Sequence, residues 1–220
     1  MMILPTSYAG IYVSTANDSP ASAHSYKEEA QQALDRIASG PSGGELLSKV
    51  AKIASGGEKK ITLKELGPNE EPYTQAVLTR SQIEKYKPRG FEQNVAIAGE
   101  LSRKGRFLKG EGTSAIIGWS PEKSSVLLNQ NGSPTRIGAS QEEKFTVLAH
   151  ELIHARHIMS GSSLAAGGNR YDPKTPNGKE ESRAVGVEGY HYSKTKKPSE
   201  NSIRAEQGLP LRKKYNPHDM

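Results

Sequence analysis

Two histidines and a glutamate in the chain have the types and the spacing of a hydrolytic metal centre. His150 and His154 stand four residues apart, so on a helix their imidazoles lie one above the other on the same face. Two imidazoles in this arrangement can bind one Zn²⁺ ion. Glu151 lies at the edge of that face, where its carboxylate can take a proton from an attacking water molecule. The H-E-x-x-H pattern therefore predicts a zinc-dependent hydrolase.

The residues around this pattern predict the helix that it needs. Apolar residues recur there at helical spacing, namely Val147, Leu148, Leu152, Ile153 and Ile158. Ser140 followed three residues later by Glu143 matches a capping box, and Gly161 fits a C-terminal cap. We therefore expect one long helix between Ser140 and Gly161, with both histidines on it.

A catalytic zinc ion needs three protein ligands, and the spacing of residues leaves the third one open. The chain contains no cysteine, so this ligand must be a histidine or a carboxylate. The candidates are His157, Asp172, Glu180, Glu181, Glu188, His191 and His218. An extended three-histidine motif is excluded, because His157 occupies its glycine position and Ser160 its last histidine position. A carboxylate on a second helix, expected at 180–187, is favoured, and spacing does not choose between Glu180 and Glu181.

The remaining sequence predicts an α+β fold with a small mixed sheet. Two amphipathic helices are expected at 25–39 and 44–55, and a half-exposed strand at 60–66. Strands at 113–119 and 125–129 are predicted to pair as a hairpin before the metal-binding helix, where a strand edge could hold an extended peptide. Four segments are expected to be less regular: a strand followed by a helix at 75–86, loop with a short helix at 88–112, loop at 130–140, and a mobile Gly/Pro-rich connector at 162–179.

The chain is expected to form one domain behind a short leader. Its 220 residues suffice for a single core. Residues 1–24 contain no Lys or Arg, and Pro5 interrupts their apolar start, so they lack the features of an ordinary export signal. We predict a flexible leader at 1–24, of the kind that injected bacterial effectors carry as a secretion signal, and a single domain at 25–220. No apolar run is long enough to span a membrane, and no membrane partner is expected.

The net charge of +6 and the pI near 9.3 raise the question of acidic or phosphate-bearing partners. Basic residues outnumber acidic ones beyond Tyr190, but no nucleic-acid-binding motif accompanies them, so nucleic acid is not the expected partner. Two alternatives to an enzyme stay open, a binding protein that keeps zinc as a structural staple and a basic nucleic-acid-binding protein. Against the first, a structural zinc site would not require Glu151.

Three short motifs together resemble the catalytic set of the clostridial neurotoxin zinc peptidases. They are H-E-L-I-H-A-x-H at His150–His157, E-E-x-R-x-x-G at Glu180–Gly186 and R-x-x-Y at Arg212–Tyr215. The chain is more similar still to the short NleD-type effector peptidases that bacteria inject into host cells by type III secretion. That likeness includes the run S-E-N-x-I-R-x-E-x-G-L-P-L-R at Ser199–Arg212 and covers about the last hundred residues.

The resemblance implies a zincin-like metallopeptidase fold, with the metal-binding helix beneath the sheet and a smaller helical C-terminal part. It implies that Glu181 is the third zinc ligand, that Glu180 supports a ligand, and that Arg212 and Tyr215 stabilise charge on the reacting carbonyl. Arg183 is expected either to pair with a ligand carboxylate or to form a surface salt bridge. One departure is that the R-x-x-Y motif follows the glutamates by only some thirty residues, far fewer than in the neurotoxins.

The same resemblance implies a biological setting for the chain. Such enzymes are secreted virulence proteins that act in the cytoplasm of a host cell, where the partner is a protein substrate. The family precedent for that substrate is a signalling protein, the mitogen-activated protein kinases. We expect a monomeric zinc endopeptidase of this kind.

Overall fold

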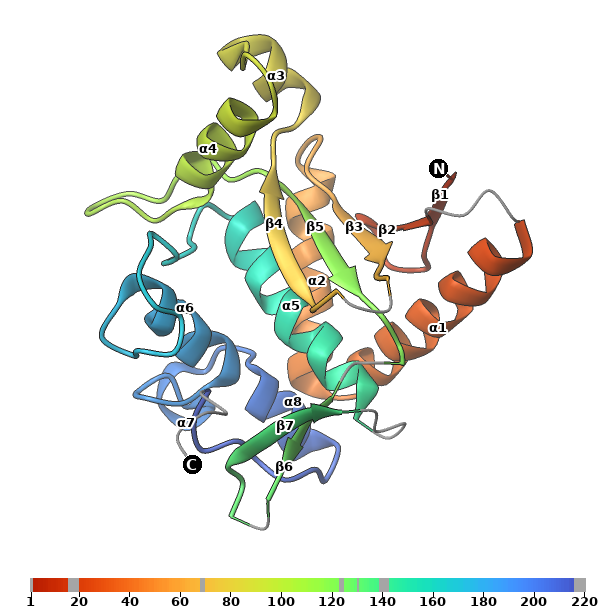
Figure 1. Cartoon of the computed structure of the whole chain (residues 1–220), viewed down its shortest axis with the longest axis vertical. Coiled ribbons are helices and arrows are strands. Elements are labelled where there is room, and N and C mark those ends of the chain that lie inside the picture. Colours follow the sequence, from red (N-terminus) through yellow and green to blue (C-terminus); the bar gives the residue numbers. More distant parts are fainter. Residues whose placement is uncertain are drawn as a thin grey trace.

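The computed structural model describes residues 2–15, 20–67, 70–122, 125–129, 131–138 and 143–215. The elements follow one another as β1 (Met2–Pro5), β2 (Ile11–Thr15), α1 (Pro20–Ala38), α2 (Pro41–Ser55), β3 (Ile61–Glu65), β4 (Tyr73–Val77), α3 (Arg80–Tyr86), α4 (Phe91–Ser102), β5 (Ser114–Trp119), β6 (Ser125–Leu128), β7 (Pro134–Gly138), α5 (Lys144–Met159), α6 (Pro176–Val185), α7 (Tyr192–Thr195) and α8 (Glu200–Glu206). Helices α2 and α5 lie behind one face of a five-stranded sheet, and a two-stranded sheet lies apart from it (Figure 1). The predicted α+β class with a helical C-terminal part is confirmed.

The five strands of the larger sheet lie in the order β1-β2-β3-β5-β4. The three central strands are parallel, while β1 and β4 run antiparallel at the two edges. The side chains of β3 alternate as a strand with one covered face requires. Ile61 and Leu63 are buried, whereas Thr62 and Lys64 point to the opposite face and are partly exposed. The apolar face is the one that receives the helices.

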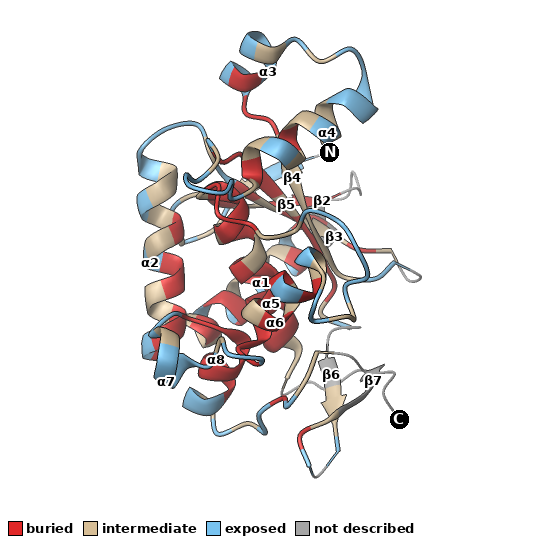
Figure 2. Cartoon of the chain, turned by 90° about the vertical axis from the view of Figure 1, so that its left-hand side faces the viewer, coloured by how far each residue is buried: buried red, intermediate tan, exposed pale blue. Residues whose placement is uncertain are grey.

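Helix α5 packs beneath this sheet and is buried along most of its length. Figure 2 shows it between the sheet and α2. Leu148 and Leu152 of α5 are fully buried in one core with Ile117 and Trp119 of β5. Each such side chain contributes about 1.5–3 kcal/mol when it is removed from water. The helix is therefore held in place by its packing, and so are the polar side chains that it carries.

The end of α5 follows the prediction, while its predicted capping box includes Ser140, which lies outside the described residues. The helix ends at Met159, and Gly161 follows with a φ of 62°, a backbone conformation that favours glycine. A Cβ atom at Gly161 would lie 1.9 Å from the carbonyl oxygen of Gly110. Glycine at this position therefore ends the helix and lets a second segment of the chain approach it closely.

The predicted hairpin of residues 113–119 with 125–129 is wrong. β5 lies in the larger sheet between β3 and β4, and its backbone groups are paired on both sides. No free edge remains on β5 for β6. Instead, β6 pairs with β7, although residues 130–140 were predicted to be a loop. An edge at which an extended peptide could pair belongs to β4, which lies at the end of the sheet next to β5.

The structure also differs from the prediction of a flexible leader at 1–24. Residues Met2–Pro5 and Ile11–Thr15 form β1 and β2, and β2 pairs in parallel with β3. Ile11 and Val13 are buried in the core, which accounts for this strand. A secretion function of the N-terminal residues stays a prediction. Among the described helices, none combines the length and the apolar character needed to cross a membrane.

Candidate metal centre

Helix α6 brings Glu181 to the two histidines of α5. It begins at Pro176, because the side chain of Thr175 caps it, and so starts four residues before the predicted helix. Glu181 Oε2 lies 3.0 Å from His150 Nε2 and 3.1 Å from His154 Nε2. The Nε2 atoms of the two histidines are 3.0 Å apart. Three potential ligand atoms, two from α5 and one from α6, thus converge on one point.

Each of the two imidazole rings is held from behind by a buried carboxylate. His150 Nδ1 donates a hydrogen bond to Glu200 Oε2 at 3.1 Å, and His154 Nδ1 donates one to Glu180 Oε1 at 3.2 Å. An ionised carboxylate can only accept, so both rings carry their proton on Nδ1. In the neutral form of each ring, the Nε2 atom then presents a lone pair towards Glu181, as a metal ligand must.

This arrangement fits a single zinc ion. Two ring nitrogens and one carboxylate oxygen meet at 3.0–3.1 Å. Burial lowers the pKa of His154, but Glu181 and Glu180 raise it more, to well above its ordinary value, so without metal a proton can bridge this ring and Glu181. A zinc ion would take the place of that proton, because metal ligands must be deprotonated. Ligand atoms about 2.0–2.1 Å from a tetrahedral zinc ion are about 3.3 Å apart, which is close to the triangle found here. His150, His154 and Glu181 would hold the ion, and a fourth coordination position would stay open.

Glu180 connects several elements around this triangle. Its Oε1 also accepts a hydrogen bond from His157 Nδ1 at 2.6 Å, and its Oε2 accepts from the N–H of Leu164 at 2.9 Å and from Arg183 Nη1 at 3.4 Å. Burial lowers the pKa of His157 to about 4 against the opposing charge of Glu180, so this ring is neutral at pH 7. Arg183 therefore contacts the carboxylate that orients His154. This contact is neither the expected pairing with a ligand carboxylate nor a surface salt bridge, because Glu180 is not one of the three converging ligands and the pair is largely buried.

Glu200, at the start of α8, has the same relation to His150 that Glu180 has to His154. Its Oε1 accepts a hydrogen bond from Arg204 Nε at 2.8 Å, and its Oε2 accepts one from Arg212 Nη1 at 2.9 Å. Burial raises the pKa of the Glu200 carboxyl, but Arg212, His150 and Arg204 together lower it further, and the net pKa lies well below its ordinary value. Glu200 belongs to the run Ser199–Arg212 that the effector peptidases share, and this is the one signal of it in the sequence.

The two residues of the R-x-x-Y motif, Arg212 and Tyr215, lie at different distances from the converging ligand atoms: Tyr215 is next to them and Arg212 is behind Tyr215. The ring of Tyr215 stacks on that of His150, with centroids 5.9 Å apart and an interplanar angle of 15°. The guanidinium of Arg212 is buried behind it, where it donates to Glu200 and, at 2.8 Å, to the carbonyl oxygen of Tyr215. Tyr215 thus faces the metal centre directly, while the observed contacts of Arg212 hold Tyr215 and Glu200. Contact of Arg212 with a reacting carbonyl stays a prediction.

A cavity of about 230 Å³ opens over the metal centre. It is lined by residues of the predicted site, namely Glu151, His154, Glu180, Glu181 and Tyr215, and by residues of β4 and of the connector after α5, among them Tyr73, Thr74, Ser163, Ala165 and Arg170. Arg170 lies over the ring of Tyr215, with its guanidinium carbon 5.7 Å from the centroid. The segment predicted as a mobile connector therefore forms part of the cavity wall.

The other candidates for the third ligand do not join the triangle. Among the described residues, Asp172, Glu188 and His191 belong to no group close enough to share an ion, and His218 lies outside those residues. His157 forms a second close group with His154 and Glu180. In that group both Nδ1 atoms already donate to one oxygen of Glu180, so no lone pairs converge there.

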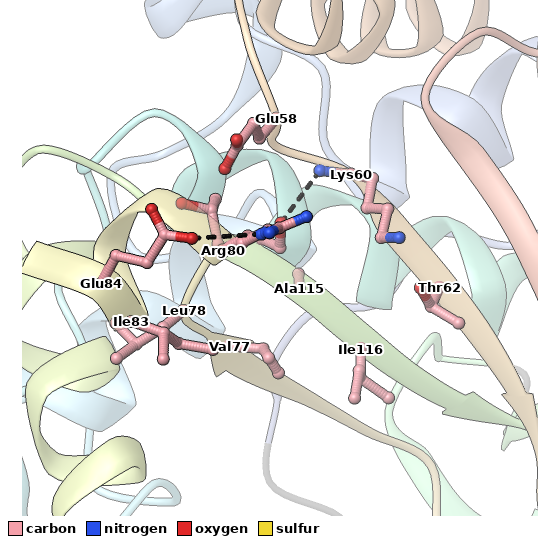
Figure 3. A pocket seen from close by; sticks show the side chains of 12 residues that line it. Glu58, Lys60, Thr62, Val77, Leu78, Arg80, Ile83, Glu84, Ala115 and Ile116 are labelled. Carbon is pink, nitrogen blue, oxygen red and sulfur yellow. Dashed lines mark hydrogen bonds and ion pairs between the residues drawn. The ribbon is translucent and has the colours of Figure 1, made fainter. Parts of the chain in front are cut away.

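A larger cavity, of about 650 Å³, lies between β3, β5 and α3 and shares no lining residue with the cavity over the metal centre (Figure 3). Its wall combines apolar side chains such as Val77 and Ile116 with the ion pair of Arg80 and Glu84. Its lining contains no histidine. The cavity over α5 is thus the one that brings potential ligands and a potential base together.

Thr74 of β4 holds the carboxylate of Glu151 in this cavity. Its Oγ1 donates a hydrogen bond to Glu151 Oε2 at 2.6 Å and also lies 3.1 Å from the carbonyl oxygen of Glu151. We expect Thr74→Val to lower kcat about tenfold, because a general base that loses its orientation loses part of its effect. Zinc content, measured by mass spectrometry, should stay unchanged. Thr74→Ser, which keeps the hydroxyl, should retain activity, and equal losses in both variants would contradict this role.

Comparison with known proteins identifies a family over nearly the whole chain. Residues 15–215 match the model of the Peptidase_M91 family, described as effector protein. No curated protein sequence matches the chain. Two similar solved structures are the catalytic domain of Clostridium botulinum neurotoxin serotype F, at 14% identity and a TM-score of 0.49, and the botulinum neurotoxin type G light chain, at 16% identity and a TM-score of 0.49. Each alignment covers 90% of this chain, but only 58% and 55% of the respective neurotoxin chains, so the chain spans little more than half of their length.

Proposed function

The chain belongs to the Peptidase_M91 family of effector proteins, and from this premise we propose that it is a metalloendopeptidase that uses zinc to cleave a host protein. The observation that supports zinc is the convergence of His150 Nε2, His154 Nε2 and Glu181 Oε2 at 3.0–3.1 Å. Glu151 lines the same cavity and is not one of these three residues. A base beside an open metal site is the arrangement that hydrolysis of a peptide bond requires.

The side chains in and around the cavity have different roles in the proposed hydrolysis. When bound, zinc supplies a Lewis acid that polarises the peptide carbonyl and makes water more acidic. The carboxylate of Glu151, oriented by Thr74, accepts a proton from the attacking water and delivers it to the nitrogen of the departing amine. The carboxylates of Glu200 and Glu180 keep the rings of His150 and His154 in the tautomer that binds metal.

We propose that Tyr215, which lines the cavity and stacks on His150, donates a hydrogen bond to the oxyanion that forms on the carbonyl. We expect Tyr215→Phe to lower kcat about 100-fold with little change in KM, because one such donor is worth about 3 kcal/mol in the transition state. The phenylalanine ring keeps the stacking on His150, so zinc affinity should not change. Steady-state kinetics with zinc titration tests this, and a loss of zinc in Tyr215→Phe would show a structural role instead.

The setting follows from the family and from kinship with the NleD-type peptidases. We propose that the protein is secreted into a host cell, acts as a monomer in its cytoplasm and cleaves a signalling protein, with mitogen-activated protein kinases as the precedent. The net charge of +6 agrees with a protein substrate that presents acidic residues.

The proposal can be tested by comparing host-cell lysate treated with the zinc-loaded wild type and with Glu151→Ala. New protein N-termini, identified by mass spectrometry, should occur only with the wild type. Zinc content should be equal in both proteins, since Glu151 is not one of the expected ligands. Identical sets of N-termini would refute a peptidase and favour a protein in which zinc has only a structural role.

A further inference from the structure

The segment Arg103–Gly110, which we call the finger, extends from the end of α4 and exposes two large apolar side chains. Its base is closed by a bridge between Lys104 and Lys109 and its tip by a hydrogen bond from the N–H of Gly105 to the carbonyl oxygen of Leu108 at 2.9 Å. Phe107 and Leu108 at the tip are 83% and 79% exposed. Neighbouring apolar side chains held this far out of the core, on a paired turn, are typical of a docking surface.

The finger is also strongly basic. Lys104, Arg106 and Lys109 are exposed and, among the described residues, form no ion pair with a carboxylate. Burial lowers the pKa of Lys197, and so do the neighbouring charges of Arg183 and Arg156 and, to a smaller extent, of Lys104 and Lys109. A cavity of about 350 Å³ beside Lys197 is lined by further basic residues, Arg183 and Lys194.

The finger is joined to the rim of the catalytic cavity. The N–H of Lys104 donates to the carbonyl oxygen of Ser163 at 2.8 Å, and Arg103 Nε donates to that of Ala165 at 2.8 Å. Ser163 and Ala165 both line the cavity over the metal centre. Figure 1 shows the finger in yellow-green below α4, next to the segment that follows α5. A substrate that fills the cavity would therefore lie beside the finger.

We propose that the finger is a docking site for the folded protein substrate, binding an acidic surface that surrounds an apolar pocket. Phe107 and Leu108 would enter the pocket, and Lys104, Arg106 and Lys109 would pair with the acidic side chains around it. This inference rests on the proposed peptidase function. A protein is favoured over a membrane because the root of the finger is bonded to the rim of a cavity that receives peptide.

The test compares cleavage of folded proteins with cleavage of short peptides. The variants are Phe107→Ser/Leu108→Ser and Lys104→Glu/Lys109→Glu. Phe91→Ser and Lys52→Glu are matched controls, since Phe91 is 76% exposed at the other end of α4 and Lys52 is exposed on α2. Each zinc-loaded protein is incubated with native host-cell lysate and, separately, with a peptide library made by digesting the same lysate. Initial rates of formation of new N-termini are then compared.

Both finger variants should cleave native proteins about 10-fold to 100-fold more slowly than the wild type and the controls, since a few central side chains carry most of the affinity of an interface. Cleavage of the peptide library should stay within about twofold, because the catalytic cavity is intact. Added salt should slow the wild type on native proteins much more than on peptides, as expected for docking between opposite charges.

Three results would overturn the docking site. In the first, both finger variants cleave native proteins at the wild-type rate. In the second, the variants lose equal factors in rate on native proteins and on peptides. In the third, the variants no longer bind phosphatidylserine-containing vesicles but cleave native proteins as before. The last result would assign the finger to membranes. Failure of the proposed function has a different signature, since the wild type itself would then cleave neither the lysate nor the library.

Discussion

Glu181→Ala is expected to lower zinc affinity about a thousandfold and to abolish cleavage with it. Glu181 Oε2 is the only carboxylate oxygen in the triangle of described ligand atoms, at 3.0 Å and 3.1 Å from the two histidine nitrogens. Without it, His150 and His154 offer two neutral ligands, and no negative charge remains to offset that of the ion. A zinc ion held by two ligands is also free to shift away from Glu151, so the activity should not return when zinc is added in excess.

Two further variants separate the ligand from its neighbours. Glu180→Ala removes the partner of His154 Nδ1 but no expected ligand, and it should weaken zinc binding only about 10-fold to 100-fold. Glu188→Ala, at an exposed position just after α6, should leave binding unchanged. Zinc affinity is measured by competition with a chromophoric chelator. Full affinity in Glu181→Ala together with a large loss in Glu180→Ala would reverse the two roles.

The metal-binding helix could be predicted because its information is local. The spacing of His150 and His154 fixes their common face on any helix, and the apolar periodicity around them predicts that helix. The roles of the two glutamates of α6 could not be predicted from spacing in the sequence. Glu180 and Glu181 are neighbours in the sequence, and their roles differ only because Glu181 points to the Nε2 atoms and Glu180 to the Nδ1 atoms, which depends on how α6 packs against α5.

Strand partners could not be predicted in the same way. The short interval between residues 113–119 and 125–129 suggested a hairpin, but β5 obtains its partners β3 and β4 from segments far away in the chain. The buried Ile11 and Val13 likewise enter the sheet through pairing of β2 with β3, which nothing in the composition of residues 1–24 indicated. Long-range pairing of strands is decided by the whole core and not by local spacing.

The residues that support the base and the ligands could not be predicted either, because they lie far from them in the sequence. Thr74 precedes Glu151 by 77 residues, and Glu200 follows His150 by 50. Hydroxyl and carboxylate groups of this kind are common on exposed surfaces, so their types carry no signal. Only the fold brings them to the base and to the ligand. The run Ser199–Arg212 that resembles the effector family does include Glu200, but it does not indicate that Glu200 contacts His150.

Glu200→Ala is expected to destabilise the protein by about 3–5 kcal/mol, because removal of one partner leaves buried charges without compensation. Arg204 is 0% exposed and Arg212 is 4% exposed, and both donate to the Glu200 carboxylate. Since small domains are stable by about 5–15 kcal/mol in total, a loss of this size endangers the fold. The free energy of unfolding, measured with urea on zinc-free protein at pH 7, tests the expectation. A change below about 1 kcal/mol would contradict it.

Glu200→Gln keeps the shape of the side chain but removes its charge, so it tests how the stability due to Glu200 depends on pH. In the folded wild type, burial raises the pKa of Glu200 but Arg212, His150 and Arg204 lower it more, so its net pKa is below the value near 4.3 of an unfolded chain. The unfolded state then binds more protons at acid pH, and the stability due to Glu200 is complete above about pH 5 and declines as the pH falls below about 4.3. Urea unfolding of the zinc-free proteins from pH 7 to pH 3 should show a steeper decline in the wild type than in Glu200→Gln. Parallel declines would mean that the Glu200 carboxylate is not the charge that balances the two buried arginines.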